Sequence, residues 1–190
     1  MTNDYSFTPF LEARDAMDYY RDDPFLQSVA CHFSGADWEE VDRAARGISP
    51  LVSGRWRRLA EEAARPQNQP SVLHFDGHGN RIDRIQRPLE TEIMEAEIFS
   101  LGVFAGKTPM WSRLTQLLLI YQNGEACIAC PLVCTEGLIA LLERFADRPE
   151  TLAILEHCKE GRDGRHGIGA QYLSEIQGGS DVPGNIVEAV

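Results

Sequence analysis

Near its carboxyl end the chain reads AQYLSEIQGGSDV over Ala170–Val182, a strand-like run that leads into a glycine-rich turn. Gly178 and Gly179 carry no side chain, so the backbone of this turn can come close to a bound molecule. Ser174 and Ser180 flank the glycines with hydroxyls that can donate to a ring nitrogen, a carbonyl or a phosphate oxygen. Exposed N–H groups in such turns bind phosphates, although many turns of this composition only reverse the chain. The stretch is therefore a candidate binding bend.

The segment Leu173–Val182, LSEIQGGSDV, resembles the flavin-contacting motif of acyl-CoA dehydrogenases, especially of their AidB-like alkylation-response branch. A Met-Thr-Glu-Lys-Gln-Gly-Gly-Ser-Asp-Val run is typical of that branch. The present chain has Ser174 where the branch has Thr, which loses a methyl group and keeps the hydroxyl.

Two earlier stretches are similar to the same branch and come in the same order. Asp76–Asp83, DGHGNRID, is similar to its Asp-x-x-Gly-x-Arg-Ile-Asp turn, and Cys130–Gly137, CPLVCTEG, is similar to its Cys-Pro-Leu-x-Met-Thr helix start. Together the matches span roughly residues 72 to 182, and the first seventy residues carry no motif of this kind. The resemblance implies the amino-terminal helical domain of the acyl-CoA dehydrogenase family and no more of it.

The resemblance also implies roles for residues of the carboxyl-terminal bend. Leu173 would pack on the face of the flavin, and the Ser174 hydroxyl would touch the isoalloxazine ring. Gly179 and Ser180 would contact the flavin pyrophosphate or the tail of a thioester substrate. Asp181 would cap and fix the turn rather than touch a ligand. FAD is the implied cofactor, shared with domains or a partner that this chain lacks.

Family members abstract an α-proton from an acyl thioester with a carboxylate, while the flavin accepts a hydride from the β-carbon. The resemblance places that carboxylate in a carboxyl-terminal helical domain, and further FAD contacts in a middle β-barrel, both expected beyond Val190. We therefore expect no catalytic residue in this chain, which would be inactive alone and would act on an acyl-CoA-type substrate only with a partner subunit that carries both domains. The alternative is a non-catalytic helical interaction or scaffold subunit with a degenerate flavin site.

The remainder of the chain reads as an all-α bundle of about six helices over residues 1–166, followed at 167–190 by the first strand of a truncated β-domain. A short extended, hairpin-like turn is expected near 72–85. Helix starts are expected at Asp37, with Glu40 three residues on, and at Ser49–Pro50. The expected apolar stripes are Val52, Trp56, Leu59 and Ala63; Leu89, Ile93 and Ala96; Trp111, Leu114, Leu118 and Tyr121; Leu138, Leu141, Leu142 and Phe145; and Leu152, Ile154 and Leu155.

Composition limits the partners of this chain. It has 190 residues, the length of one domain or of one domain with a small appendage, and a net charge of −11. Such a charge repels phosphate backbones, so we expect no nucleic acid partner. The longest apolar candidate, Leu117–Tyr121, is too short for a membrane span, and the amino terminus has no signal-peptide pattern. A cytoplasmic location with reduced thiols is expected, because five cysteines do not suit a disulfide framework.

The cysteines give the main rival interpretation. Cys127, Cys130 and Cys134 have a C-x-x-C-x-x-x-C spacing, and Cys158 or His157 could add a fourth ligand for zinc or an iron–sulfur cluster. Their neighbours are apolar, so the favoured interpretation is that the thiols pack as small hydrophobic groups and bind no metal.

Overall fold

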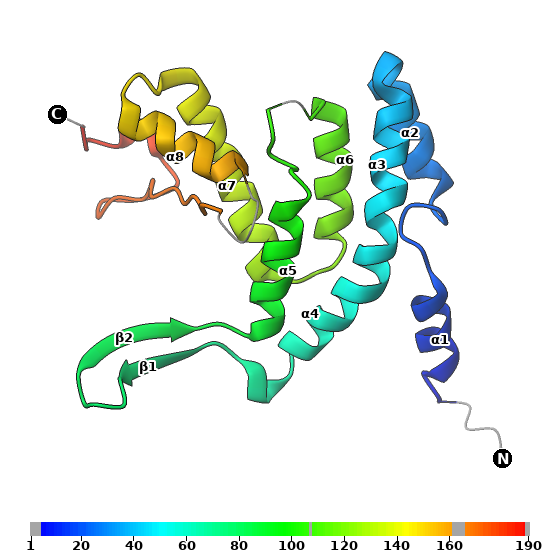
Figure 1. Cartoon of the computed structure of the whole chain (residues 1–190), viewed down its shortest axis with the longest axis horizontal. Helices are drawn as coiled ribbons and strands as arrows, with labels where there is room; N and C mark the ends of the chain where they lie inside the picture. Colours follow the sequence, from blue (N-terminus) through cyan, green and yellow to red (C-terminus); the bar gives the residue numbers. More distant parts are fainter. Residues whose placement is uncertain (1–4, 107, 161–165, 189–190) are drawn as a thin grey trace.

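The computed structural model describes residues 5–106, 108–160 and 166–188, and these residues form a mostly helical body with one small hairpin (Figure 1). The predicted all-α class is confirmed. The elements are α1 (Thr8–Ala16), α2 (Pro24–Ser34), α3 (Trp38–Pro50), α4 (Arg57–Ala63), β1 (Ser71–Phe75), β2 (Arg81–Gln86), α5 (Leu89–Ser100), α6 (Met110–Tyr121), α7 (Ala126–Phe145) and α8 (Pro149–Glu160). In Figure 1, α3 lies between α2 and α6, α4 continues from α3 towards α5, and α7 and α8 pair at the carboxyl-terminal side.

The helix start predicted at Ser49–Pro50 is wrong, because α3 and α4 form one continuous helical rod through Leu51–Trp56. Pro50 has no N–H for the α-helical ladder, and the backbone responds with a π-helical stretch rather than a break. The Ser49 hydroxyl donates to the Asp18 carboxylate at 2.5 Å and therefore does not cap a helix. The start predicted at Asp37 is confirmed, since α3 begins at Trp38.

The core is centred on the stripe predicted for the second half of this rod. Val52, Trp56 and Ala63 are buried, and Leu59 is partly buried against the core. Trp56 is 1% exposed, and its indole N–H donates to the Glu97 carboxylate at 2.7 Å. That bond satisfies the one polar atom of the ring, so the largest side chain of the core is buried without an unpaired donor.

The buried face of α6 differs from the predicted stripe. Leu117 and Ile120 enter the core, whereas Leu114 and Leu118 are 40% and 45% exposed. The buried side of this helix also carries the polar residues Ser112, Thr115 and Gln116, so the apolar periodicity did not indicate which side would be covered. The uncovered side joins α2 at an apolar hollow of about 120 Å³, beside the stacked rings of Phe33 and Trp111.

The strands β1 and β2 form an antiparallel hairpin that extends away from the helices (Figure 1). Val72 faces Ile85 in the register, and both strands are exposed along their whole length. At the turn, the Asp76 carboxylate accepts the N–H groups of His78 and Asn80 at 2.8 and 2.9 Å. The extended, hairpin-like segment predicted near 72–85 is thus confirmed.

The helix start predicted at Cys130–Pro131 is wrong, because α7 begins at Ala126 and contains Pro131. The Thr135 hydroxyl donates to the Pro131 carbonyl at 2.7 Å, so this part of the helix is held by a side-chain bond as well. The motif residues therefore lie within the helix, and Thr135 faces the interior of the protein with 0% exposure.

The helix α7 also corrects the prediction that no segment reaches the length of a membrane span. Its 20 residues are long and apolar enough to cross a membrane, by length and composition alone. Helices of folded domains pass the same test, and α7 packs against α5 and α8 and carries Glu136, which pairs with Arg113 at 3.3 Å. Only 22% of its apolar window is buried, so much of an apolar helix surface is uncovered.

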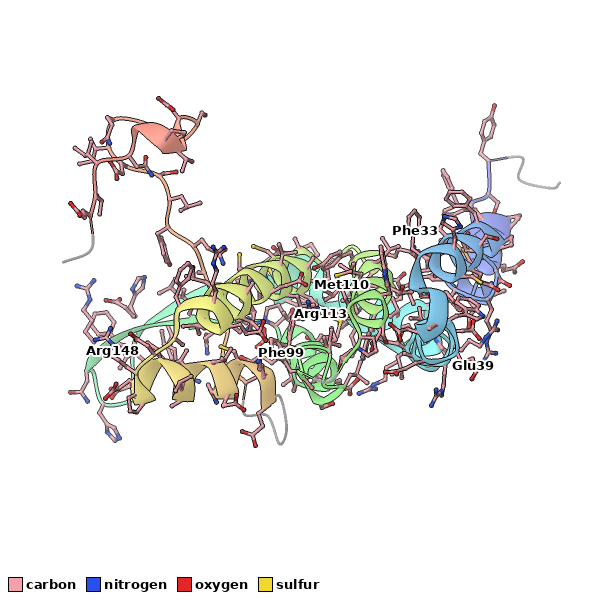
Figure 2. The ribbon with its side chains drawn as sticks, turned by 90° about the horizontal axis from the view of Figure 1, so that it is seen from above. Phe33, Glu39, Phe99, Met110, Arg113 and Arg148 are labelled. Carbon is pink, nitrogen blue, oxygen red and sulfur yellow. The ribbon has the colours of Figure 1, made fainter. Side chains whose placement is uncertain are left out.

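The tail, Gly167–Glu188, does not form the strand predicted for it. Its described residues contain one isolated bridge, between Glu175 and Gly178, and one short 3₁₀ turn at Val182–Gly184. A strand requires a neighbouring strand to accept its backbone hydrogen bonds, and the tail has none beside it. Seen from above, the tail stands away from the helices after its first few residues (Figure 2).

Candidate functional site

The start of the tail packs closely against two helices at glycines, Gly169 against α7 and Gly167 against α8. A Cβ atom at Gly169 would lie 2.7 Å from Leu138 Cβ and 3.2 Å from the Cys134 carbonyl oxygen, so only glycine fits against α7 here. The Gly169 N–H donates to the Thr135 hydroxyl at 3.0 Å, and the Gln171 amide donates to the Cys134 carbonyl at 2.7 Å. These contacts fix the direction in which the tail leaves the body.

A buried charged cluster holds the residue that precedes the tail. His166 Nε2 lies 2.8 Å from one oxygen of Glu95, and Arg87 donates to the other at 2.5 Å. The Glu95 and His166 side chains are only 8% and 12% exposed, and the imidazole stacks on Phe99 with 4.2 Å between ring centroids. The Glu95 carboxylate raises the pKa of Arg87. No sequence motif indicates this cluster, because Glu95 and His166 are 71 residues apart.

The structure brings two of the four predicted site residues together and leaves all four accessible. The Ser174 hydroxyl lies over Gly179, where a Cβ would be 2.5 Å from Ser174 Oγ. Leu173 is 58% exposed, and Ser174, Gly179 and Ser180 are exposed as well. Backbone bonds in both directions between Glu175 and Gly178, at 3.0 and 3.1 Å, close the turn. The bend therefore presents an apolar side chain and two hydroxyls on one small, open loop.

Glu175, rather than Asp181, is the carboxylate that fixes this bend. The Asp181 side chain makes no capping hydrogen bond, and only its carbonyl accepts the N–H of Gly184, at 3.0 Å. The Glu175 carboxylate accepts the N–H groups of Ile186 and Val187 at distances from 2.8 to 3.1 Å. Those bonds tie the end of the tail to the start of the turn, and they hold the pKa of Glu175 below its usual range. The role predicted for Asp181 is thus corrected.

The cysteines of α7 do not gather around a point. Cys127 and Cys130 are exposed, Cys134 is partly exposed and Cys158 is buried on α8. Among the described residues, no group of three or more His, Cys, Asp or Glu side chains is placed to hold a metal ion. Desolvation raises the pKa of the Cys127 and Cys158 thiols, which disfavours the thiolate that a metal requires. The predicted packing of the thiols is wrong for Cys127 and Cys130, which are exposed on α7, and only Cys158 on α8 is buried.

The bend is expected to open at low pH through Glu175. Its pKa is depressed by hydrogen bonds to the carboxylate, so its contribution is complete above the ordinary glutamate pKa of about 4.3 and is lost as the pH falls through the lower, folded value. Hydrogen exchange at the Ile186 and Val187 amides should therefore be slow at neutral pH and accelerate beyond the intrinsic trend below about pH 4. Glu175→Ala should abolish that protection at every pH. Equal protection in this variant would contradict the role of the carboxylate.

Two solved structures share this fold. The chain superimposes on "Crystal Structure of Caenorhabditis elegans ACDH-11 in complex with C11-CoA" with a TM-score of 0.75 and 18% identity, over 90% of this chain and 30% of that one. It superimposes on "Bd2924 apo-form" with a TM-score of 0.72 and 24% identity, over 90% of this chain and 35% of that one. The chain thus spans about a third of the length of either protein. No curated protein matches it significantly by sequence.

The family profile described as "Adaptive response protein AidB N-terminal domain" matches residues 11–157. The match includes every helix from α2 to α7, the hairpin and most of α8, and it ends before the tail. It confirms the resemblance inferred from the three motifs, and the two solved structures agree with it in fold. This chain belongs to the AidB N-terminal domain family.

Proposed function

We propose that the chain is the amino-terminal helical part, or a subunit, of an acyl-CoA dehydrogenase-like flavoprotein that oxidises an acyl thioester by α,β-dehydrogenation. The base and most of the FAD contacts come from a partner chain, or from further domains, with a β-barrel and a carboxyl-terminal helical bundle. The observation that carries this proposal is the open bend at the end of an AidB-type helical domain, with Leu173, Ser174, Gly179 and Ser180 all accessible. We also propose a cytoplasmic location and no nucleic acid partner.

The chemistry of the bend fits a flavin. The Ser174 and Ser180 hydroxyls can donate hydrogen bonds to polar edges and phosphates, and Leu173 offers an apolar surface for a ring. A side chain at position 179 would displace the Ser174 hydroxyl, because a Cβ there would lie 2.5 Å from Ser174 Oγ. Bound FAD would supply the hydride acceptor. The residues of this chain would bind and orient it, and none of them is proposed as the base.

Uncovered apolar surfaces support the proposed need for more protein. Val133, Leu141 and Phe145 on α7 are 52%, 55% and 63% exposed, and Tyr172 and Ile176 of the tail are almost completely exposed. Apolar surface of this extent is characteristic of interfaces. The same surfaces suit the second candidate, a scaffold subunit that docks on a partner and holds no flavin.

Native purification of the tagged chain from its own cells distinguishes the two candidates. The proposed flavoprotein predicts a complex that contains a second, β-rich chain or domain and shows the visible absorbance of a flavin. In that complex, Ser180→Ala should weaken FAD binding by about 1 kcal/mol, roughly fivefold, through loss of one hydrogen bond. Ser28→Ala, on the exposed side of α2, is the matched control and should leave FAD affinity unchanged. A stable complex that stays colourless with added FAD would favour the scaffold.

A further inference from the structure

The hairpin of β1 and β2 has strand edges without a neighbour. Its sheet has two strands, so the outer side of each strand is an edge, and both strands are exposed along their whole length. Every second residue of an antiparallel strand directs its backbone N–H and C=O to that outer side, where they can pair with another strand. A hairpin of two strands is only marginally stable in water, and a third strand makes it more stable. The hairpin thus has both the groups and the need for a further strand.

The two edges differ in their chemistry. The β2 strand carries Arg81, Asp83 and Arg84, and Asp83 has a φ of +43° where the register of the two strands is irregular. Charged side chains and an irregular backbone are features that keep an edge strand from pairing. The β1 strand, Ser71–Phe75, contains no Asp, Glu, Lys or Arg. Of the two edges, β1 is therefore the one that is open to another strand.

Apolar side chains lie on both faces of the hairpin. Leu73 and Phe75 share one face, as residues two apart in a strand do, and they are 39% and 56% exposed. Val72 and Ile85 lie opposite each other on the other face and are 49% and 68% exposed. A strand added beside β1 would pack its own side chains against these and remove apolar surface from water.

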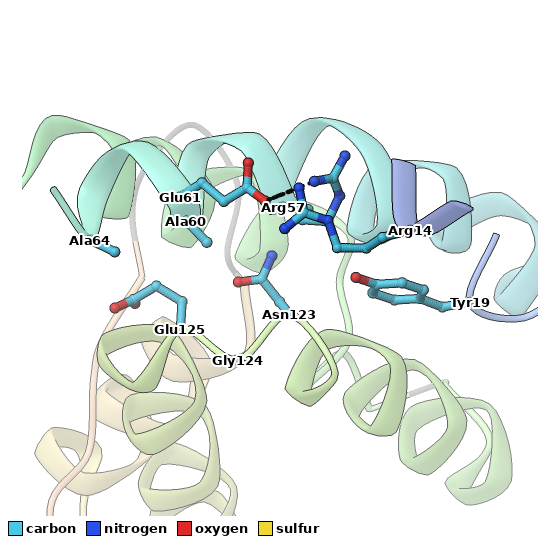
Figure 3. Close-up of a pocket in the computed structure, with 9 residues that line it drawn as sticks. All are labelled: Arg14, Tyr19, Arg57, Ala60, Glu61, Ala64, Asn123, Gly124 and Glu125. Carbon is cyan, nitrogen blue, oxygen red and sulfur yellow. Dashed lines mark hydrogen bonds and ion pairs between the residues drawn. The ribbon is translucent and has the colours of Figure 1, made fainter. Parts of the chain in front are cut away.

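Charge favours a second copy of this chain at the hairpin over contact elsewhere. The net charge of −11 makes two copies repel each other over most of their surface. The pocket beside α4 offers no free basic group to offset this, because Arg57 contacts Glu61 at 2.8 Å and Arg14 contacts the same carboxylate at 3.0 Å (Figure 3). The hairpin, residues 71–86, contains two Arg and two Asp and has no net charge. Two copies therefore meet there with the least repulsion.

The position of the hairpin agrees with such a contact. The strands extend away from the helices, so two hairpins can meet without bringing the acidic helical bodies together (Figure 1). A closed β-barrel, which we proposed for the partner chain or further domains, has no free strand edge to place beside β1. A second β1 presents the same open edge, and a two-fold axis lets each edge cover the other.

We propose that two copies of this chain associate through antiparallel pairing of their β1 strands, which gives a four-stranded sheet in the order β2, β1, β1, β2. When all five residues of β1 pair, the two-fold axis passes beside Leu73, which lies opposite its counterpart in the other copy. The outer edges are then the charged β2 strands, so the assembly closes as a dimer. The paired strands are short, so the dimer is weak, with a dissociation constant between about 1 µM and 1 mM. The dimer requires neither FAD nor the proposed flavoprotein function.

Sedimentation equilibrium of the full chain between about 10 µM and 1 mM measures this constant, and the average mass should rise from that of a monomer towards that of a dimer. Hydrogen exchange over the same concentrations should show protection of the β1 amides that increases with the amount of dimer. A chain that stays monomeric over the whole range, or a dimer that adds no protection at β1, overturns the proposal.

Charges introduced at Leu73 test the pairing directly. Leu73→Lys and Leu73→Glu each place like charges opposite one another at the two-fold axis, so each should raise the dissociation constant about tenfold or more. A mixture of the two variants should recover the dimer, because opposite charges then face each other. Glu at this position also lies across the hairpin from Arg84, so the second variant keeps the hairpin if the first fails to fold.

Ile85→Lys is the matched control, because it adds the same charge to the hairpin on the β2 strand, and it should dimerise as the parent chain does. Dimers of unchanged affinity in folded Leu73 variants would show that the chain associates through another surface. A mixture of folded Leu73→Lys and Leu73→Glu chains that stays monomeric would contradict the antiparallel pairing about Leu73.

Discussion

Glu95→Ala should lower the free energy of unfolding by about 3 kcal/mol, the lower end of the range for breaking a buried ion pair. The substitution leaves Arg87 and His166 without the carboxylate that both contact, at 2.5 and 2.8 Å. We take the lower end because Arg87 is 30% exposed and can turn towards water. Urea unfolding monitored by circular dichroism measures the loss, and hydrogen exchange should show that the tail is released before the helices unfold.

Two further variants make this test specific. Glu95→Gln keeps one hydrogen-bond acceptor and a side chain of similar volume, so it should lose less stability than the alanine variant. Glu92→Ala removes an exposed carboxylate from the same helix and should change stability by less than about 0.5 kcal/mol. If Glu95→Ala unfolds at the parental urea concentration, the cluster does not hold the start of the tail and its geometry is incidental.

Gly169→Val should detach the tail from α7 and lower stability by about 1 to 3 kcal/mol, the usual cost of overpacking. A new Cβ would lie 2.7 Å from Leu138 Cβ, 2.9 Å from Leu138 Cδ2 and 3.2 Å from the Cys134 carbonyl oxygen. The Leu138 Cδ2 atom can turn aside, but the Cβ atom and the backbone oxygen cannot move without the helix. Displacement would also break the bond from the Gly169 N–H to Thr135. Limited proteolysis should then cut the tail faster, while the helical signal in circular dichroism stays close to that of the parent.

Gly47→Ala provides the matched control for this glycine. Nothing lies within 4 Å of a Cβ at Gly47, which is inside the continuous rod of α3 and α4, so alanine should stabilise the helix by roughly 0.5 to 1 kcal/mol. Proteolysis of the tail should be unchanged in this variant. Equal tail protection in Gly169→Val and in the parent would show that the close approach to α7 is not what positions the bend.

The contacts of Glu95 and Gly169 both affect the proposed flavin site. The four residues of the bend, Leu173, Ser174, Gly179 and Ser180, themselves have few contacts with the helices. Their position depends on the contacts that precede them, at His166, Gly169 and Gln171. In the proposed complex, Glu95→Ala and Gly169→Val should therefore weaken FAD binding although neither residue touches the bend. Weaker FAD binding in these two variants would indicate that contacts outside the bend position it for the flavin.

Local patterns allowed much of this molecule to be predicted. Turn glycines with Asp76 indicated the hairpin, the spacing of Val52, Trp56 and Ala63 indicated a buried stripe, and the LSEIQGGSDV run indicated the family that the profile confirms. Each of these depends on neighbours within a few turns of helix or within one hairpin, where backbone geometry sets which residues meet. The roles of the four bend residues stay predictions.

Other features follow from contacts between distant parts of the chain. Pro50 carried a strong signal for a helix start, yet packing on both sides of it kept one rod intact with a π-helical stretch. The covered side of α6 could not be predicted from its apolar pattern, because its buried residues include the polar Ser112, Thr115 and Gln116 and because its neighbours α2 and α3 are set by the fold as a whole.

The amino acid order of this chain was sufficient to indicate its all-α class, its hairpin and the motif of its terminal bend, since these arise from interactions between residues close in sequence. Folding in three dimensions was needed to pair Glu95 with His166 and to seat Gly169 against Leu138. Hydrogen bonds and steric fit act over a few ångström of space regardless of sequence separation, so residues that carry no motif become a cluster only when the helices that hold them pack together.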